Sequence, residues 1–141
     1  MIYTTYFDNI KNLDKNIIPI AICGKCPDDW TGLKFPKLAP KKGFWNIWEK
    51  TRDNDYYVEH YNNEVLSKFE SPFDVLDQLY DILPQNIKDY FHIINCPPWE
   101  DNAHHIALVC FEKPGEFCHR TLVAKWINNY FGREVVKEYD S

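Results

Sequence analysis

The hydrophobic positions of the chain fall into two patterns: short apolar runs, and longer segments with apolar residues three or four positions apart. The runs predict buried strands, because the strands of a parallel sheet are apolar on both faces. They cover residues 17–23 and 106–111. Residues 2–7, where Tyr and Thr alternate with apolar neighbours, have the composition of a strand, and we expect residues 134–139 to form a final short strand. The three- and four-residue spacing predicts helices. These cover residues 55–69, 73–83 and 118–131, with one or two further helical turns at 44–51.

Two segments follow neither pattern. Residues 25–42 are rich in proline and glycine, so we expect a long irregular loop, which inside a compact domain is usually functional or disordered. Residues 84–105 also contain several prolines, and the apolar stretch at 90–94 fits either a strand or an insertion packed on the core.

The alternation of strands and helices predicts an α/β fold in a single domain over residues 1–141. We expect a small, largely parallel sheet flanked by helices, as in a Rossmann-like three-layer sandwich. The N-terminus lacks the basic and apolar regions of an export signal, and no apolar run approaches the ~18 residues of a membrane span. We therefore expect a soluble, cytoplasmic protein without a membrane partner, whose five unevenly spaced cysteines are reduced thiols.

The charge distribution narrows the choice of ligand. A net charge of −5 argues against general nucleic-acid binding, which usually needs a basic face. Residues 25–52 nevertheless hold seven basic against three acidic residues, so this stretch carries +4 and the rest of the chain −9. A local positive field suits a small anion. A solvated basic loop is the alternative.

The strongest candidate site is the connection between the apolar run 106–111 and the helix that begins at Cys118. Ligands of open α/β sheets lie where strands end and helix N-termini point, because the free N–H groups there attract anions. This connection brings together Glu112, Lys113, Cys118, His119 and Arg120. We expect Arg120, Lys113 and the helix N-terminus to hold a phosphate or carboxylate, with His119 as hydrogen-bond donor or acid/base.

Two other interpretations of the same residues stay open. Glu112 can pair with Arg120 in a purely structural contact, or it can bind a ribose hydroxyl or orient His119. Cys118 at a helix N-terminus, beside a histidine and an arginine, has the surroundings of a nucleophile with a lowered thiol pKa. The candidate catalytic residues are therefore Cys118, His119 and Glu112. For Cys118, however, a buried cysteine that packs the loop is the preferred explanation, because the chain lacks the Cys-x5-Arg spacing of phosphate-binding loops.

Further ligand-binding candidates come from the first strand and the basic loop. They are Thr4, Tyr6, Lys25, Lys34 and Lys37. Aromatic residues near the basic loop can stack on a base, although most aromatic side chains pack in a core. They are Tyr3, Tyr6, Trp45, Trp48, Tyr56 and Tyr57.

A metal site is not expected from the spacing of the cysteines. Cys23 and Cys26 form a C-x-x-C pair without a second pair, and His104 and His105 are the only obvious further ligands. The pair leads into a loop and not into a helix, which argues against a thioredoxin-type redox motif. We expect no cofactor.

The sequence Cys110-Phe111-Glu112-Lys113, followed by Cys118-His119-Arg120, resembles the domain-of-unknown-function 488 family. An apolar strand that runs into C-x-E-K, with a short loop leading to C-H-R and a helix, is typical of that family. The N-terminal MIYTTYF and the strand that ends in Cys23-Gly24-Lys25 look like its short phage- and Firmicutes-type branch. The resemblance implies an α/β sandwich, and it implies no activity for particular residues.

Together these features predict a domain that binds a nucleotide-like anionic small molecule at the carboxyl ends of its strands, whether it processes the molecule or only sequesters it. One alternative is an interaction module for a host protein partner, as in a phage-related protein, with the CFEK and CHR motifs purely structural. A second is a thiol-dependent enzyme that uses Cys118.

Overall fold

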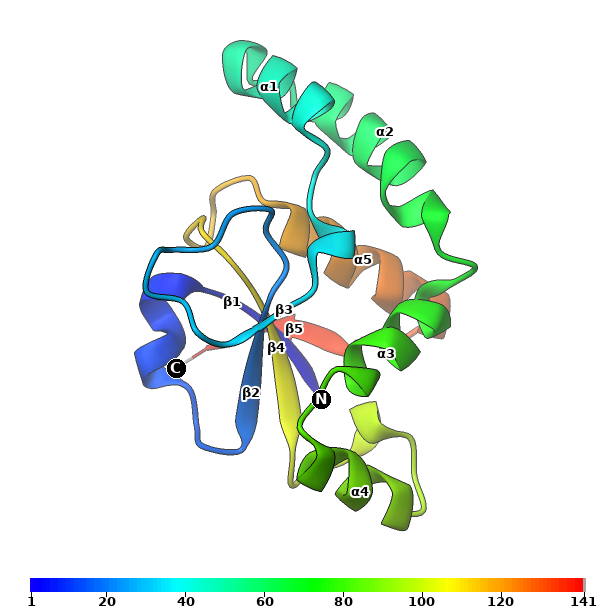
Figure 1. Cartoon of the computed structure of the whole chain (residues 1–141). Helices are drawn as coiled ribbons and strands as arrows, with labels where there is room; N and C mark the ends of the chain where they lie inside the picture. Colours follow the sequence, from blue (N-terminus) through cyan, green and yellow to red (C-terminus); the bar gives the residue numbers. More distant parts are fainter. Residues whose placement is uncertain (141) are drawn as a thin grey trace.

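The computed structural model describes residues 1–140 and shows an α/β fold with a five-stranded, all-parallel sheet, so the predicted fold class is confirmed (Figure 1). The strand order is β3-β2-β4-β1-β5, which places β4 at the centre. The strands are β1 (Ile2–Tyr6), β2 (Ile17–Ala21), β3 (Leu33–Lys34), β4 (His105–Cys110) and β5 (Val136–Glu138). The central strand is almost fully buried, as expected where both faces of a sheet are covered.

The segments between the strands form α-helices and short 3-10 helices. The α-helices are α1 (Lys42–Thr51), α2 (Asn54–Glu64), α3 (Pro72–Asp81), α4 (Gln85–Ile93) and α5 (His119–Phe131). The 3-10 helices are η1 (Phe7–Asn12), η2 (Pro36–Leu38), η3 (Leu66–Lys68) and η4 (Pro98–Glu100). Ser71 accepts a hydrogen bond from the backbone N–H of Asp74 and Pro72 begins α3, whereas Gly132 ends α5 at a positive φ of 68°.

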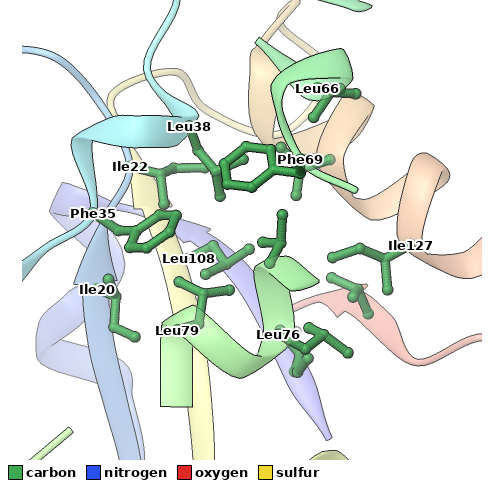
Figure 2. Close-up of a cluster of buried hydrophobic side chains, with 14 of the residues drawn as sticks. Ile20, Ile22, Phe35, Leu38, Leu66, Phe69, Leu76, Leu79, Leu108 and Ile127 are labelled. Carbon is green, nitrogen blue, oxygen red and sulfur yellow. The ribbon is translucent and has the colours of Figure 1, made fainter. Parts of the chain in front are cut away.

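The main hydrophobic core lies between one face of the sheet and helices α3 and α5. The parallel register places Ile20 beside Leu108, and successive residues of a strand point to opposite faces. Figure 2 shows Leu76 and Leu79 of α3 and Ile127 of α5 gathered over these two sheet residues. All five side chains are fully buried. Because Cys110 follows Leu108 by two residues, its side chain points to this same helical face.

The opposite face of the sheet carries smaller side chains and a thinner cover. Ala21, Ala107 and Val109 are fully buried there, and η1 lies on this side of the sheet (Figure 1). Thr5 of β1 accepts a hydrogen bond of 3.0 Å from the Asn9 side chain of η1. The small side chains on this face let the short 3-10 helix η1 approach the sheet closely.

Helices α1 and α2 form a hairpin beyond the carboxyl edge of the sheet (Figure 1). Asp53 caps α2 by accepting a hydrogen bond from the backbone N–H of Tyr56. Phe44 of α1 and Tyr57 and Tyr61 of α2 turn their buried rings toward one another. The Tyr61 hydroxyl donates 2.6 Å to the carbonyl of Leu38, which fixes the hairpin to the segment that leads into it.

One expectation from the sequence is wrong in detail, and one open alternative is resolved. Residues 25–42, expected to be irregular, contain β3, which extends the sheet through the pairs Ile20–Leu33 and Ala21–Lys34. Residues 90–94 do not form a strand, because most of them belong to α4, whose hydrogen bonds are local. The mixed apolar and polar stretch fits an amphipathic helix with Ile93 pointing to solvent.

The helices of residues 1–140 are too short or too polar to cross a membrane.

We predict that Asn128→Ala detaches β5 and lowers the free energy of unfolding by about 1–3 kcal/mol. The Asn128 side chain accepts hydrogen bonds of 2.8 Å from the backbone N–H groups of Val135 and Val136, and donates 2.9 Å to the carbonyl of Val136. Chemical denaturation measures the effect, with the exposed neighbour Asn129→Ala as control. Equal stability of the two variants would show that the Asn128 contacts do not hold β5.

Candidate functional site

A cavity of about 610 Å³ lies at the carboxyl edge of the sheet, beneath the α1–α2 hairpin. Its base is formed where β2 and β4 end and where α5 begins. This is the usual ligand position in an open α/β sheet. The volume falls in the range of about 300–1,000 Å³ that is typical of small-molecule pockets.

The upper wall of the cavity is aromatic and comes from the hairpin. Trp45 and Trp48 of α1 and Tyr57 of α2 line it, together with Phe117 from the loop before α5. The Phe117 ring centroid lies 5.6 Å from that of Trp48 and 4.9 Å from that of Tyr57, the latter edge to face. Burial, reinforced by Glu112, raises the pKa of the Tyr57 phenol, so this side chain is neutral at physiological pH. The wall therefore offers flat, uncharged surface.

The charged groups of the lining lie at the cavity edge. Lys25 follows the end of β2, Lys42 begins α1, and both are exposed. Glu112 is half-buried on the loop after β4. Two lysines against one carboxylate leave a net positive charge, which suits an anionic ligand.

His119 forms part of the cavity base and is held in one tautomer. Its ring is buried, and Nε2 donates a hydrogen bond of 2.9 Å to the carbonyl of Ile22, which only accepts. The other nitrogen, Nδ1, therefore carries a lone pair. Burial is the main cause that lowers the pKa of His119 to about 4, and Arg120 lowers it further, whereas the bond to Ile22 opposes the shift. His119 is thus a neutral imidazole at physiological pH.

Arg120 lies behind the cavity wall, and its guanidinium is bound on every side. Its Nε and Nη2 donate hydrogen bonds of 3.0 Å each to the two carboxylate oxygens of Glu138, and the side chain is only 1% exposed. Its Nη1 donates to the backbone carbonyl of Glu112 and, at 3.0 Å, to Sγ of Cys110. Arg120 therefore makes a structural ion pair, as one of the two interpretations held. Its carboxylate partner is Glu138, however, and Glu112 contributes only its backbone carbonyl.

The predicted ligand residues of β1 belong to this same buried cluster. Thr4 donates a hydrogen bond of 2.7 Å to Glu138, and the Tyr6 ring centroid lies 5.9 Å from the Arg120 guanidinium carbon. Both residues therefore support the base of the cavity from behind.

The predicted lysines separate into two groups. Lys25 lines the cavity, whereas Lys34, Lys37 and Lys113 are exposed and lie away from its lining. Lys37 donates a hydrogen bond of 2.9 Å to Gln78 of α3. Two further lining residues were missed from the sequence: Lys42, which is only one member of the basic stretch 25–52, and Phe117. The sequence does contain a signal for Lys42: Lys42 and Trp45 are three residues apart, so they lie on the same side of a helix.

The five cysteines do not all remain free thiols, contrary to the sequence-based expectation. The sulfur atoms of Cys110 and Cys118 are joined, because the end of β4 and the start of α5 converge at the cavity base. Cys23 and Cys26 are free, with sulfur atoms 3.9 Å apart. Burial, with Cys26 as a second cause, raises the pKa of Cys23 to about 12, so Cys23 is a protonated thiol and a poor nucleophile.

Comparison of the chain with protein-family models, with curated proteins and with solved structures finds no match. The resemblance to the domain-of-unknown-function 488 family therefore stays a prediction, and the function is argued from the geometry of the cavity.

We predict that Arg120→Ala lowers the free energy of unfolding by about 1.5–3 kcal/mol, because it removes the charge-assisted hydrogen bonds that the buried guanidinium donates to Glu138 and its hydrogen bond to the carbonyl of Glu112. The matched control is Arg133→Ala, which removes an exposed ion pair with Glu100 that is worth at most about 1 kcal/mol. Urea denaturation separates the two cases. Small and equal losses would show that the Arg120 cluster is not a structural support.

We also predict that protonation of His119 destabilises the protein in mild acid. His119 titrates near 6.5 when unfolded and near 4 when folded, so the unfolded chain binds one more proton between these values. The stability that His119 contributes is complete above about pH 6.5 and is lost as the pH falls toward 4, with a slope of up to about 1.4 kcal/mol per pH unit. His119→Gln should remove this component between pH 5 and 6.5, and the exposed His92→Gln should keep it. An unchanged pH profile in His119→Gln would contradict the burial of a neutral ring.

Proposed function

We propose that this protein binds a nucleotide-like anionic small molecule in the cavity at the carboxyl edge of its sheet. The observation that carries the proposal is the combination of an aromatic wall with two lysines at the edge of one pocket. The two halves of a nucleotide, a flat base and a charged phosphate, need these two kinds of surface.

The aromatic wall supplies the binding surface for the base. Trp45 is half-buried, so part of its indole is accessible from the cavity, whereas Trp48 is held from behind by a hydrogen bond of 2.9 Å from its Nε1 to Asn54. Stacking of a base on an aromatic side chain is worth about 1–3 kcal/mol and tolerates any base. The wall therefore favours a planar ligand without selecting one base.

We place the anionic group at the edge of the cavity, near Lys25, Lys42 and the first residues of α5. The N-terminus of a helix attracts anions through its free N–H groups and its dipole, and Cys118 and His119 bring this end of α5 to the lining. Arg120 supports this arrangement from behind. Because its guanidinium already donates to Glu138, Cys110 and Glu112, we expect the lysines to contact the anionic group directly.

We predict that Lys42→Ala weakens the binding of AMP by about tenfold to a hundredfold, the value of one charge-assisted hydrogen bond of roughly 1.5–3 kcal/mol. Lys37→Ala is the matched control, because Lys37 contacts Gln78 outside the cavity. Isothermal titration with AMP, UMP and inorganic phosphate compares the variants. Equal affinities for AMP in the two variants would place the phosphate elsewhere.

The same titration tests the proposal as a whole. AMP and UMP should both bind, and inorganic phosphate should bind more weakly because it lacks the stacking surface. Trp45→Leu should reduce the difference between nucleotide and phosphate. Absence of binding by folded protein at millimolar nucleotide would contradict the proposal and favour the interaction module.

A further inference from the structure

Three side chains with metal-binding atoms meet at the base of the cavity. They are Cys110 at the end of β4, and Cys118 and His119 at the start of α5. Their Sγ and Nδ1 atoms lie within 4.8 Å of one another, and all three residues are buried. Two thiolates and one imidazole are ligands that zinc prefers.

The histidine is already in the state that a metal requires. Its Nε2–H donates to the carbonyl of Ile22, and its Nδ1 lone pair faces Sγ of Cys118 at 3.9 Å. A hydrogen bond from the distal nitrogen to a backbone carbonyl is the usual outer contact of a histidine that binds metal through its other nitrogen.

The backbone spacing of the two cysteines also suits a bridging ion once the disulfide is reduced. Their Cα atoms are 7.7 Å apart, whereas disulfides usually join Cα atoms roughly 4.4–6.8 Å apart. Two thiolates on one zinc ion, with bonds of about 2.3 Å and tetrahedral angles, hold their sulfur atoms about 3.8 Å apart. Such a site accommodates the wider separation.

The surrounding charges also fit a zinc site. Arg120 donates 3.0 Å to Sγ of Cys110, which stabilises the thiolate form. Its own positive charge is balanced by Glu138. One Zn²⁺, two thiolates and a neutral imidazole together carry no net charge, so burial of the complex avoids the penalty of an isolated buried ion.

From these observations we propose that the reduced protein binds one zinc ion through Cys110, Cys118 and His119. A thiol reductant supplies two electrons and two protons, which cleave the Cys110–Cys118 bond to two thiols while the reductant is oxidised to its own disulfide. Zn²⁺ then displaces both thiol protons to solvent as the two zinc–sulfur bonds form.

The three ligands all line the cavity, so the fourth coordination position opens into it. Three protein ligands with an open position are typical of zinc sites that bind water or a substrate. The site is distinct from the Cys23–Cys26 pair, because its ligands come from β4 and α5.

The test is zinc analysis of the reduced protein. The wild type is treated with a phosphine reductant, intact mass confirms the addition of two hydrogens at the disulfide, and the protein is equilibrated with Zn²⁺ and desalted. We expect about one zinc per chain in the wild type and in the control Cys23→Ser, and loss of the zinc in Cys118→Ser. Zinc lost in Cys23→Ser and kept in Cys118→Ser would overturn the assignment.

A cobalt titration gives a second readout that needs no variant. Co²⁺ added to the reduced wild type should produce thiolate-to-metal charge-transfer absorption and the intense visible bands of a tetrahedral site, and Zn²⁺ should abolish both. Absence of stoichiometric metal in the reduced protein, or a disulfide that resists reduction in the folded state, would overturn the proposal. Neither assay contains a nucleotide, so its result is independent of the proposed anion binding.

Discussion

The contact between the buried Arg120 and the half-buried Glu138 is the interaction on which the carboxyl edge of this protein depends. It joins the first turn of α5 to the edge strand β5, and the same guanidinium reaches the end of β4 through Cys110 and the carbonyl of Glu112. Three elements that meet only in the folded chain are thereby fixed at one point. Cys118 and His119 directly precede Arg120, so their positions at the cavity base follow from this contact.

The cavity combines this rigid base with a separate cap. The sheet and α5 supply cysteine sulfur atoms, an imidazole and a helix N-terminus, whereas the α1–α2 hairpin supplies indole and phenol rings. The two parts have different requirements. The base needs fixed geometry for polar and charged groups, whereas a stacking surface tolerates small displacements of the rings. This division explains why the polar network is concentrated behind the base.

The sequence was most informative where local pattern decides structure. The apolar run 106–111 and the three- and four-residue spacing within 73–83 identified β4 and α3, because burial on a strand or on one side of a helix shows in neighbouring residues. It was least informative about partners distant in the chain. Glu138 was not recognised as the partner of Arg120, since only the pairing of β5 with β1 brings it there. The pairing of Cys110 with Cys118 was missed for a similar reason, although the motif that contains both residues was identified.

Two-dimensional ¹H–¹⁵N NMR of the protein titrated with AMP tests most directly whether the carboxyl-edge cavity is the ligand site. We expect chemical-shift changes to concentrate on the backbone amides of Lys25, Lys42 and His119 and on the indole N–H of Trp45. Residues of α4, at the opposite end of the sheet, should be unaffected (Figure 1). Changes centred on α4, or an unchanged spectrum at millimolar AMP, would show that this cavity is not the ligand site.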